Sequence, residues 1–173
     1  GGSNDPTIHL IRGQSYEFVN AMNAHPFRIQ STPNGSNIFL SFGEIDCRRD
    51  EGIIKILDAR ASNLLSTISQ TVSGYVDFVY EVMDDRDLNL FFLGVHAPLL
   101  PVNMETKKLD SSYETQNKII ELFNKELALQ TSKKGSHYID LFYTTKQNDG
   151  DFHADEYHLL PSTLDIIERQ LNQ

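Results

Sequence analysis

Asp155 and His158 stand three positions apart near the C-terminal end of the chain, in the run Asp-Glu-Tyr-His. Residues with this spacing can share one face of a helical turn. A carboxylate beside an imidazole fixes the tautomer of the ring and stabilises its protonated form. The pair therefore has the composition of a general base with an orienting group. Chance also places Asp and His three apart in many proteins, so the pair is a hypothesis that needs further elements around it.

A serine that such a base could activate lies near the other end of the chain. Ser15 follows a Gly-Gln pair, directly after the apolar run 8–11. A serine that attacks an ester carbonyl, with a histidine that takes its proton and returns it to the leaving alcohol, is the chemistry of a serine hydrolase. The structural alternative for Ser15 is a helix N-cap after a turn, where serine is common. For His158 the alternative is a surface histidine before a helix.

Short apolar runs alternate with longer helical periods, which is typical of an α/β domain with a mostly parallel sheet. The expected strands are residues 7–12, 27–30, 37–42, 88–95 and 137–143. The expected helices are residues 16–23, 51–83, 111 to about 130, and 163–171. The apolar stripe of 51–83 is weakened at Ser62-Asn63 and at Gly74, so the pattern predicts a kink or a break there.

Cap residues mark the ends of the later helices. Ser111 and Glu114 form a capping box at the start of the helix that runs to about residue 130. Gly135 is placed to end that helical unit. Ser162 and Asp165 predict a cap on the last helix.

Polar clusters follow several of the expected strands. In parallel sheets, ligands bind outside the carboxyl ends of the strands. Those ends carry Ser15, the segment 43–48, the loop that holds His96, and the turn 155–158. The fold class therefore predicts that four separate polar clusters converge on one edge of the sheet.

Two of these clusters have both a functional and a structural interpretation. Glu44, Asp46 and Arg48 alternate along the chain, so they would face one side of an extended segment. They could form the polar floor of a site, or a salt bridge that ties the strand end to its neighbour. His96 stands before an Ala-Pro pair, where it could contact substrate or serve only as a turn residue.

Length and charge limit the class of protein. The chain has 173 residues, a length typical of one domain with a full core, so residues 1–173 are expected to form a single domain. The formal net charge is −9 and the basic doublets are scattered, which argues against a nucleic-acid partner. No apolar run approaches the roughly 18 residues of a membrane span. Residues 1–4 have the composition of a cloning remnant, no signal peptide follows them, and a cytoplasmic protein without a membrane partner is expected.

Metal binding is the alternative use of the polar residues. The single Cys47 rules out an intrachain disulfide and a thiolate zinc site. Imidazole and carboxylate ligands suit many metals. Such ligands could come from His153, His158, Asp155 and Asp46. No HExxH or similar ligand motif supports a metal, so neither a metal nor another cofactor is expected, and a metal-dependent hydrolase is the weaker alternative.

These residues, in this order, resemble the SGNH (GDSL-type) hydrolase family over residues 8–170. The Gly-Gln-Ser at 13–15 looks like the family's Gly-Asp-Ser block, and Asp155 with His158 matches its last block, Asp-x-x-His. The segment 43–48, Gly-Glu-Ile-Asp-Cys-Arg, is similar to a version of the third block in a bacterial subgroup. The run 94–98, Gly-Val-His-Ala-Pro, looks like a strand end of the same subgroup.

The resemblance implies a flavodoxin-like, three-layer α/β/α sandwich and a serine esterase. Ser15 would be the nucleophile, His158 the base and Asp155 the group that orients it. The expected substrate is a small or carbohydrate-linked acyl ester, with Gly43, Glu44, Asp46 and Arg48 around the oxyanion and the floor of the site.

The chain departs from the family pattern at the oxyanion hole. Ile45 stands where the family has an Asn that donates to the oxyanion, and the second family block is not evident between residues 16 and 40. Arg48 is the candidate replacement donor. A non-catalytic SGNH-like module of a larger assembly is the main alternative to an esterase.

Overall fold

The computed structural model describes residues 35–49, 51–60, 63–83, 87–99, 111–147 and 151–172. The expected strands 7–12 and 27–30, the expected helix 16–23 and Ser15 lie outside the described residues. The flavodoxin-like strand order would need the strand at 7–12, so this finer part of the expectation remains a prediction.

The described strands form one parallel sheet, as the sequence predicts. β1 (Ser36–Ser41) pairs with β2 (Leu88–Leu93), and β2 pairs with β3 (His137–Ile139), in the order β1-β2-β3. In this register Leu40 lies beside Phe92, which lies beside Tyr138. Strand residues point alternately to the two faces of a sheet. Phe91 and Phe92 accordingly belong to different apolar clusters.

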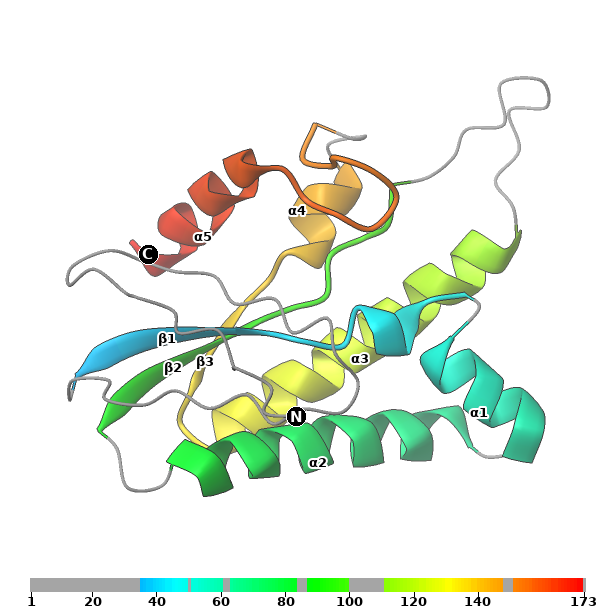
Figure 1. Ribbon diagram of the computed structural model, residues 1–173, viewed down its shortest axis with the longest axis horizontal. Helices are drawn as coiled ribbons and strands as arrows, with labels where there is room; N and C mark the ends of the chain where they lie inside the picture. Colours follow the sequence, from blue (N-terminus) through cyan, green and yellow to red (C-terminus); the bar gives the residue numbers. More distant parts are fainter. Residues whose placement is uncertain are drawn as a thin grey trace, which may run out of the picture.

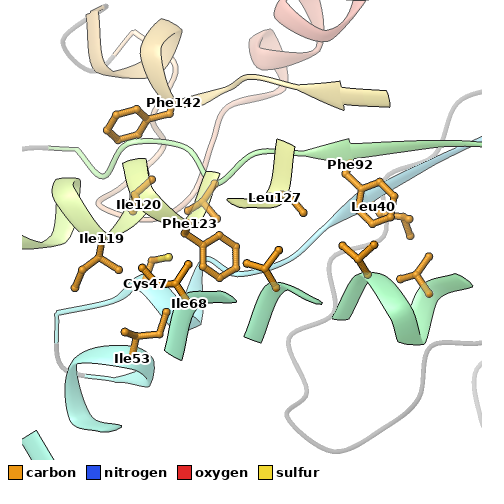
Figure 2. Close-up of a cluster of buried hydrophobic side chains, with 14 of the residues drawn as sticks. Leu40, Cys47, Ile53, Ile68, Phe92, Ile119, Ile120, Phe123, Leu127 and Phe142 are labelled. Atoms are coloured by element: carbon orange, nitrogen blue, oxygen red, sulfur yellow. The ribbon is translucent and has the colours of Figure 1, made fainter. Parts of the chain in front are cut away.

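Long helices cover one face of the sheet. α1 (Gly52–Arg60), α2 (Leu64–Met83) and α3 (Ser111–Lys133) follow the strands in the chain, and α2 and α3 pack beneath the sheet in Figure 1. The core between them consists of buried, mainly apolar side chains (Figure 2). Its labelled members include Leu40, Cys47, Ile53, Ile68, Phe92, Phe123 and Leu127.

The second face is covered by the C-terminal part of the chain. The 3-10 turn Pro161–Thr163 leads into α5 (Leu164–Leu171), which lies above the sheet in Figure 1. Ile166 of α5 packs with Phe91 and Leu93 of β2 in a second, smaller cluster. The domain is therefore an α/β/α structure in three layers, and the predicted α/β fold class is confirmed.

The strand expected at 137–143 is wrong in its second half. β3 ends at Ile139, and α4 (Phe142–Gln147) begins three residues later. The Asp140 carboxylate explains the change, because its Oδ1 accepts the backbone N–H of Phe142 at 2.8 Å and of Tyr143 at 3.4 Å. An acidic side chain in this position caps a helix. Phe142 is buried as expected, but from a helix.

The expected interruption of 51–83 occurs between α1 and α2. Asn63 Oδ1 accepts the backbone N–H of Leu65 at 2.9 Å and of Ser66 at 3.3 Å, so its side chain caps the start of α2. Gly74, the other weak point, lies inside α2 without ending it. The cost of one glycine, about 1 kcal/mol, is smaller than the gain from burying the apolar stripe of a long helix.

Other element ends differ by a few residues from the expectation. α3 continues to Lys133, and Gly135 with φ +74° follows it as predicted. The backbone N–H of Ser136 donates to Thr131 O at 3.0 Å, which closes the helix end. The expected cap at Ser162 is wrong, because α5 begins after Thr163 without a side-chain cap.

Candidate active site

Three of the four predicted polar clusters meet at the carboxyl edge of the sheet. They are the short 3-10 helix η1 (Ile45–Cys47) after β1, the loop 94–99 after β2, and the turn 155–158. The Arg48 guanidinium lies 4.7 Å from the centre of the Tyr157 ring, and His96 Nε2 is 2.9 Å from Tyr157 O. The fourth cluster, Ser15, lies outside the described residues.

Gly43 turns the chain from β1 into η1. Its φ of +91° is in a region that side-chain-bearing residues rarely adopt. A Cβ atom there would lie 2.5 Å from the Phe123 ring and 3.2 Å from Val95 Cγ2. The glycine therefore allows the strand end to approach both α3 and the loop after β2, and it brings segment 44–48 to the edge.

The loop after β2 is held by the neighbouring strand at its start, where the Gly94 N–H donates to Ile139 O at 2.8 Å, and by side chains beyond it. Asn124 of α3 accepts from the Val95 backbone N–H and donates to the Val95 carbonyl, both at 2.8 Å. Thr145 of α4 lies 3.0 Å from the Ala97 backbone N–H, which it accepts through Oγ1. These contacts place His96 between two anchored residues.

Asp155 and His158 lie in direct contact. His158 Nδ1 is 2.7 Å from Asp155 Oδ2 and 2.9 Å from Oδ1. Asp155 Oδ1 also accepts the backbone N–H groups of Tyr157 and His158, each at 2.9 Å. These two N–H groups and the His158 ring lower the pKa of Asp155 to about 2. The carboxylate is therefore ionised across the whole physiological range.

The turn that carries this pair is an irregular bend, and the two side chains meet without a helical turn. An isolated antiparallel bridge joins His153 and Leu159, with Ala154 N–H donating to His158 O at 2.8 Å. His153 Nε2 is 2.6 Å from Ala97 O, and the Leu99 N–H donates to Glu156 O at 3.0 Å. The short bridge closes the turn, and the loop after β2 holds it in place.

Glu156 anchors the same turn to two other elements. Its Oε1 accepts from Arg49 Nη2 at 2.5 Å and from the Tyr113 hydroxyl at 2.9 Å. The Arg49 guanidinium lies 4.0 Å from the centre of the Tyr113 ring. Burial opposes ionisation of Glu156, but contacts with Tyr157, Tyr113 and Arg49 outweigh it and lower the pKa of Glu156. Sequence reasoning missed this anchor, because its members are spread over the chain.

Residues 45–47 form a 3-10 turn, so the expected extended segment is wrong. Glu44 and Arg48 flank this turn, and the two form a bidentate ion pair of 2.7 and 2.9 Å. Glu44 therefore accepts hydrogen bonds from two guanidinium donors of Arg48. Of the two interpretations of this charge pattern, the contact corresponds to the salt bridge. Asp46 forms no ion pair with any described residue, and burial raises its pKa.

His96 is largely buried and faces the turn 155–158. Burial lowers the pKa of His96 to about 4, and repulsion from His153 and His158 adds to this. The ring is therefore neutral at pH 7. Because the Tyr157 carbonyl can only accept, Nε2 carries the ring proton, and Nδ1 carries a lone pair.

A small pocket lies between these elements. Its volume is about 10 Å³, and it is lined by Glu44, Val95, His96, Pro98, Gln116, Ile120 and Tyr157. Gln116 was not among the predicted site residues. The available signal was its place on the mainly apolar stripe of α3, where it is only 2 % exposed.

The described residues contain no group of three or more His, Cys, Asp and Glu side chains arranged to hold a metal ion. Among the described helices, none is long and apolar enough to cross a membrane. No protein-family model matches the chain, and a search of curated proteins finds no match.

Proposed function

We propose that this protein is a serine ester hydrolase of the SGNH type that removes an acyl group from a small or carbohydrate-linked ester. Ser15 Oγ would attack the ester carbonyl carbon while His158 Nε2 takes the hydroxyl proton. The alcohol would leave with that proton, and water would then release the acyl group from Ser15. Asp155 would hold the imidazole in the tautomer that this sequence of steps requires.

The hydrogen bond between Asp155 and His158 Nδ1 carries the proposal. It leaves Nε2 as the acceptor of the ring, and no described residue hydrogen-bonds to Nε2. The His158 side chain is 72 % exposed, so a substrate and a nucleophile could reach it. The pair also lies at the carboxyl edge of a parallel sheet, where ligands bind in this class of fold.

The oxyanion would need hydrogen-bond donors other than the side chains at position 45 and of Arg48. Ile45 has no side-chain donor, and Arg48 commits Nε and Nη2 to Glu44. The Ser15 backbone N–H and a further donor would have to serve. Loss of one oxyanion donor costs roughly 100- to 1,000-fold in rate in other hydrolases, so slow turnover is expected.

Hydrolysis of 4-nitrophenyl acetate by the full chain, with and without a chelator, tests the proposal. Ser15→Ala should abolish turnover, and the chelator should have no effect. Ser66→Ala, at an exposed position of α2, is the matched control and should retain full activity. Most of the activity surviving in purified Ser15→Ala would remove Ser15 from the mechanism, and loss of activity with the chelator would favour a metal-dependent hydrolase.

A non-catalytic module is the second candidate, favoured by Ile45 at the position of the family's oxyanion donor. In that case the same protein would show no turnover of any short acyl ester above the rate of the Ser15→Ala variant. It would still bind its ligand at the edge of the sheet formed by η1, loop 94–99 and the turn 155–158.

A further inference from the structure

The buried face of α3 carries three polar side chains among its apolar residues. Gln116, Asn124 and Thr131 are 2 %, 5 % and 0 % exposed. Asn124 binds the Val95 backbone through both ends of its amide, and the Thr131 hydroxyl donates to Leu127 O at 2.9 Å. These two residues have clear structural partners. Gln116 differs from them.

The side-chain oxygen of Gln116 has no hydrogen-bond partner among the residues that the structure describes. It is one of four buried side-chain atoms without a partner among the described residues, and the only one of the four whose residue lines the pocket. A buried acceptor left unsatisfied destabilises a folded protein, because the group loses its hydrogen bonds to water without replacement. Such groups are rare in folded proteins, and they often mark a place that a water molecule or a ligand fills.

A second acceptor without a partner among the described residues belongs to another residue of the pocket lining. His96 binds Tyr157 O through Nε2, and no described residue hydrogen-bonds to its Nδ1 lone pair. The Glu44 carboxylate, also part of the lining, is neutralised by Arg48. The pocket therefore combines free acceptors with little net charge, which suits a neutral donor better than a cation or an anion.

The size of the pocket limits the group that can enter. A volume of about 10 Å³ holds roughly one water molecule, or one group of the same size. A hydroxyl has this size and donates one hydrogen bond, which matches the unpartnered Gln116 Oε1. Tyr157, which forms one wall, directly precedes the proposed base His158 in the chain.

We propose that this pocket is a hydroxyl-binding subsite, in which Gln116 Oε1 accepts a hydrogen bond from a free hydroxyl of the substrate. The substrate class is then a partly acylated polyol or sugar, with a free hydroxyl close to the ester. This inference rests on the proposed esterase function and deepens it. Gln116 acts here as a specificity-determining residue, while Ser15, His158 and Asp155 carry the chemistry.

Paired substrates test the subsite through hydrolysis. Glycerol monoacetate offers free hydroxyls beside its ester, and propyl acetate has a similar length without them. The wild-type protein should prefer the monoacetate by about tenfold or more in kcat/KM. Gln116→Met keeps the shape of the side chain but removes the acceptor, so it should remove that preference. Gln130→Met, elsewhere on α3, is the matched control and should keep the preference.

A binding measurement separates the subsite from the esterase activity. Glycerol titrated into the Ser15→Ala protein should shift the NMR signals of the Gln116 side-chain amide and of the His96 ring. The same titration into Gln116→Met should leave the His96 signals unchanged. Because no turnover is involved, this arm reports on the pocket even if no ester is cleaved.

The outcomes distinguish the two proposals. Glycerol shifts without hydrolysis of any ester would keep the subsite and reject the esterase. Hydrolysis with no preference for the monoacetate, and no glycerol shifts, would keep the esterase and reject the subsite. If Gln116→Met changes the melting temperature but neither the substrate preference nor the glycerol shifts, the pocket holds a structural water and the subsite is rejected. If that variant does not fold, the substrate preference and the glycerol titration of the protein with Gln116 intact decide the question.

Discussion

The Asp155 carboxylate binds His158 at two points, the ring Nδ1, which lies 2.7 Å from Oδ2, and the backbone N–H, which donates to Oδ1 at 2.9 Å. Oδ1 also accepts the backbone N–H of Tyr157 at 2.9 Å. The orientation of the imidazole and the shape of the turn therefore depend on one side chain. This gives Asp155 both a conformational and a chemical role, which substitutions can separate.

Asp155→Asn should leave the turn in place and impair turnover. The amide oxygen of Asn can still accept the backbone N–H groups, but its NH₂ group cannot accept from Nδ1–H. The wrong tautomer of His158 would then be favoured, and a comparable change costs about 10⁴-fold in kcat in a serine protease. The measurement is kcat on 4-nitrophenyl acetate, with circular dichroism to verify the fold.

Asp151→Asn provides the control, because Asp151 is an exposed carboxylate in the same segment. It removes the same charge without touching His158 and should leave kcat within about twofold of the wild type. Equal losses in the two variants would mean that charge near the site, and not orientation of His158, explains the effect.

Gly43→Ala should destabilise the domain strongly. A positive φ costs an alanine about 1–2 kcal/mol, and the contact of 2.5 Å with the Phe123 ring requires a shift in the core. We expect a loss of about 2–4 kcal/mol in the free energy of unfolding, measured by urea denaturation. Gly74→Ala is the matched control, since α2 leaves open space there, and it should stabilise by about 0.5–1 kcal/mol. A neutral Gly43→Ala would contradict the assigned packing of β1 against α3.

The sequence was a good guide to features that depend on neighbours in the chain. Apolar runs predicted the parallel strands β1 and β2, and the Ser-Asn pair predicted the break before α2. The Asp155–His158 contact is also local, so spacing alone could suggest it. The strand expected to continue to Tyr143 failed because Phe142 and Tyr143 favour strands, while Asp140 competes for their backbone N–H groups.

Features that join distant segments could not be predicted in the same way. The Arg49–Glu156 pair spans 107 positions, and nothing in either local pattern selects the other partner. Segment 44–48 was ambiguous, because Glu44 and Arg48 fit both an alternating strand pattern and an i,i+4 helical pair. Gly43 precedes η1 and has a positive φ. The close approach of its backbone to Phe123, a residue far away in the chain, requires a glycine there, and this contact could not be predicted from the local sequence.

Arg48→Met should lower stability modestly and leave catalysis nearly unchanged. The Glu44–Arg48 pair is bidentate, but both side chains are about one quarter exposed, which limits its contribution to about 1 kcal/mol. Measuring both the melting temperature and kcat of this variant distinguishes a structural role of Arg48 from a catalytic one. A large fall in kcat with an unchanged KM and melting temperature would instead make Arg48 an oxyanion donor. Glu44→Gln is the matched partner, and the double variant should lose little more than either single one.

The pH dependence of stability should report the burial of His96. Its pKa is lowered from 6.5 to about 4 in the folded protein. Between these two pH values the unfolded chain binds a proton at His96 and the folded chain does not, so unfolding is favoured as the pH falls. Above about pH 6.5 the ring is neutral in both states and contributes no pH dependence. The loss from pH 7 to pH 4 should approach about 3 kcal/mol from this group.

Urea unfolding of the wild type and of His96→Gln at pH 7, 5.5 and 4.5 measures this contribution. Glutamine can donate to Tyr157 O in place of Nε2–H, but it does not titrate. The variant should therefore lose less stability on acidification than the wild type, and the difference between the two should grow as the pH falls from 6.5 towards 4. Stability curves that run parallel over this range would place the ring of His96 in solvent, and the pocket beside Tyr157 would then lose its second acceptor.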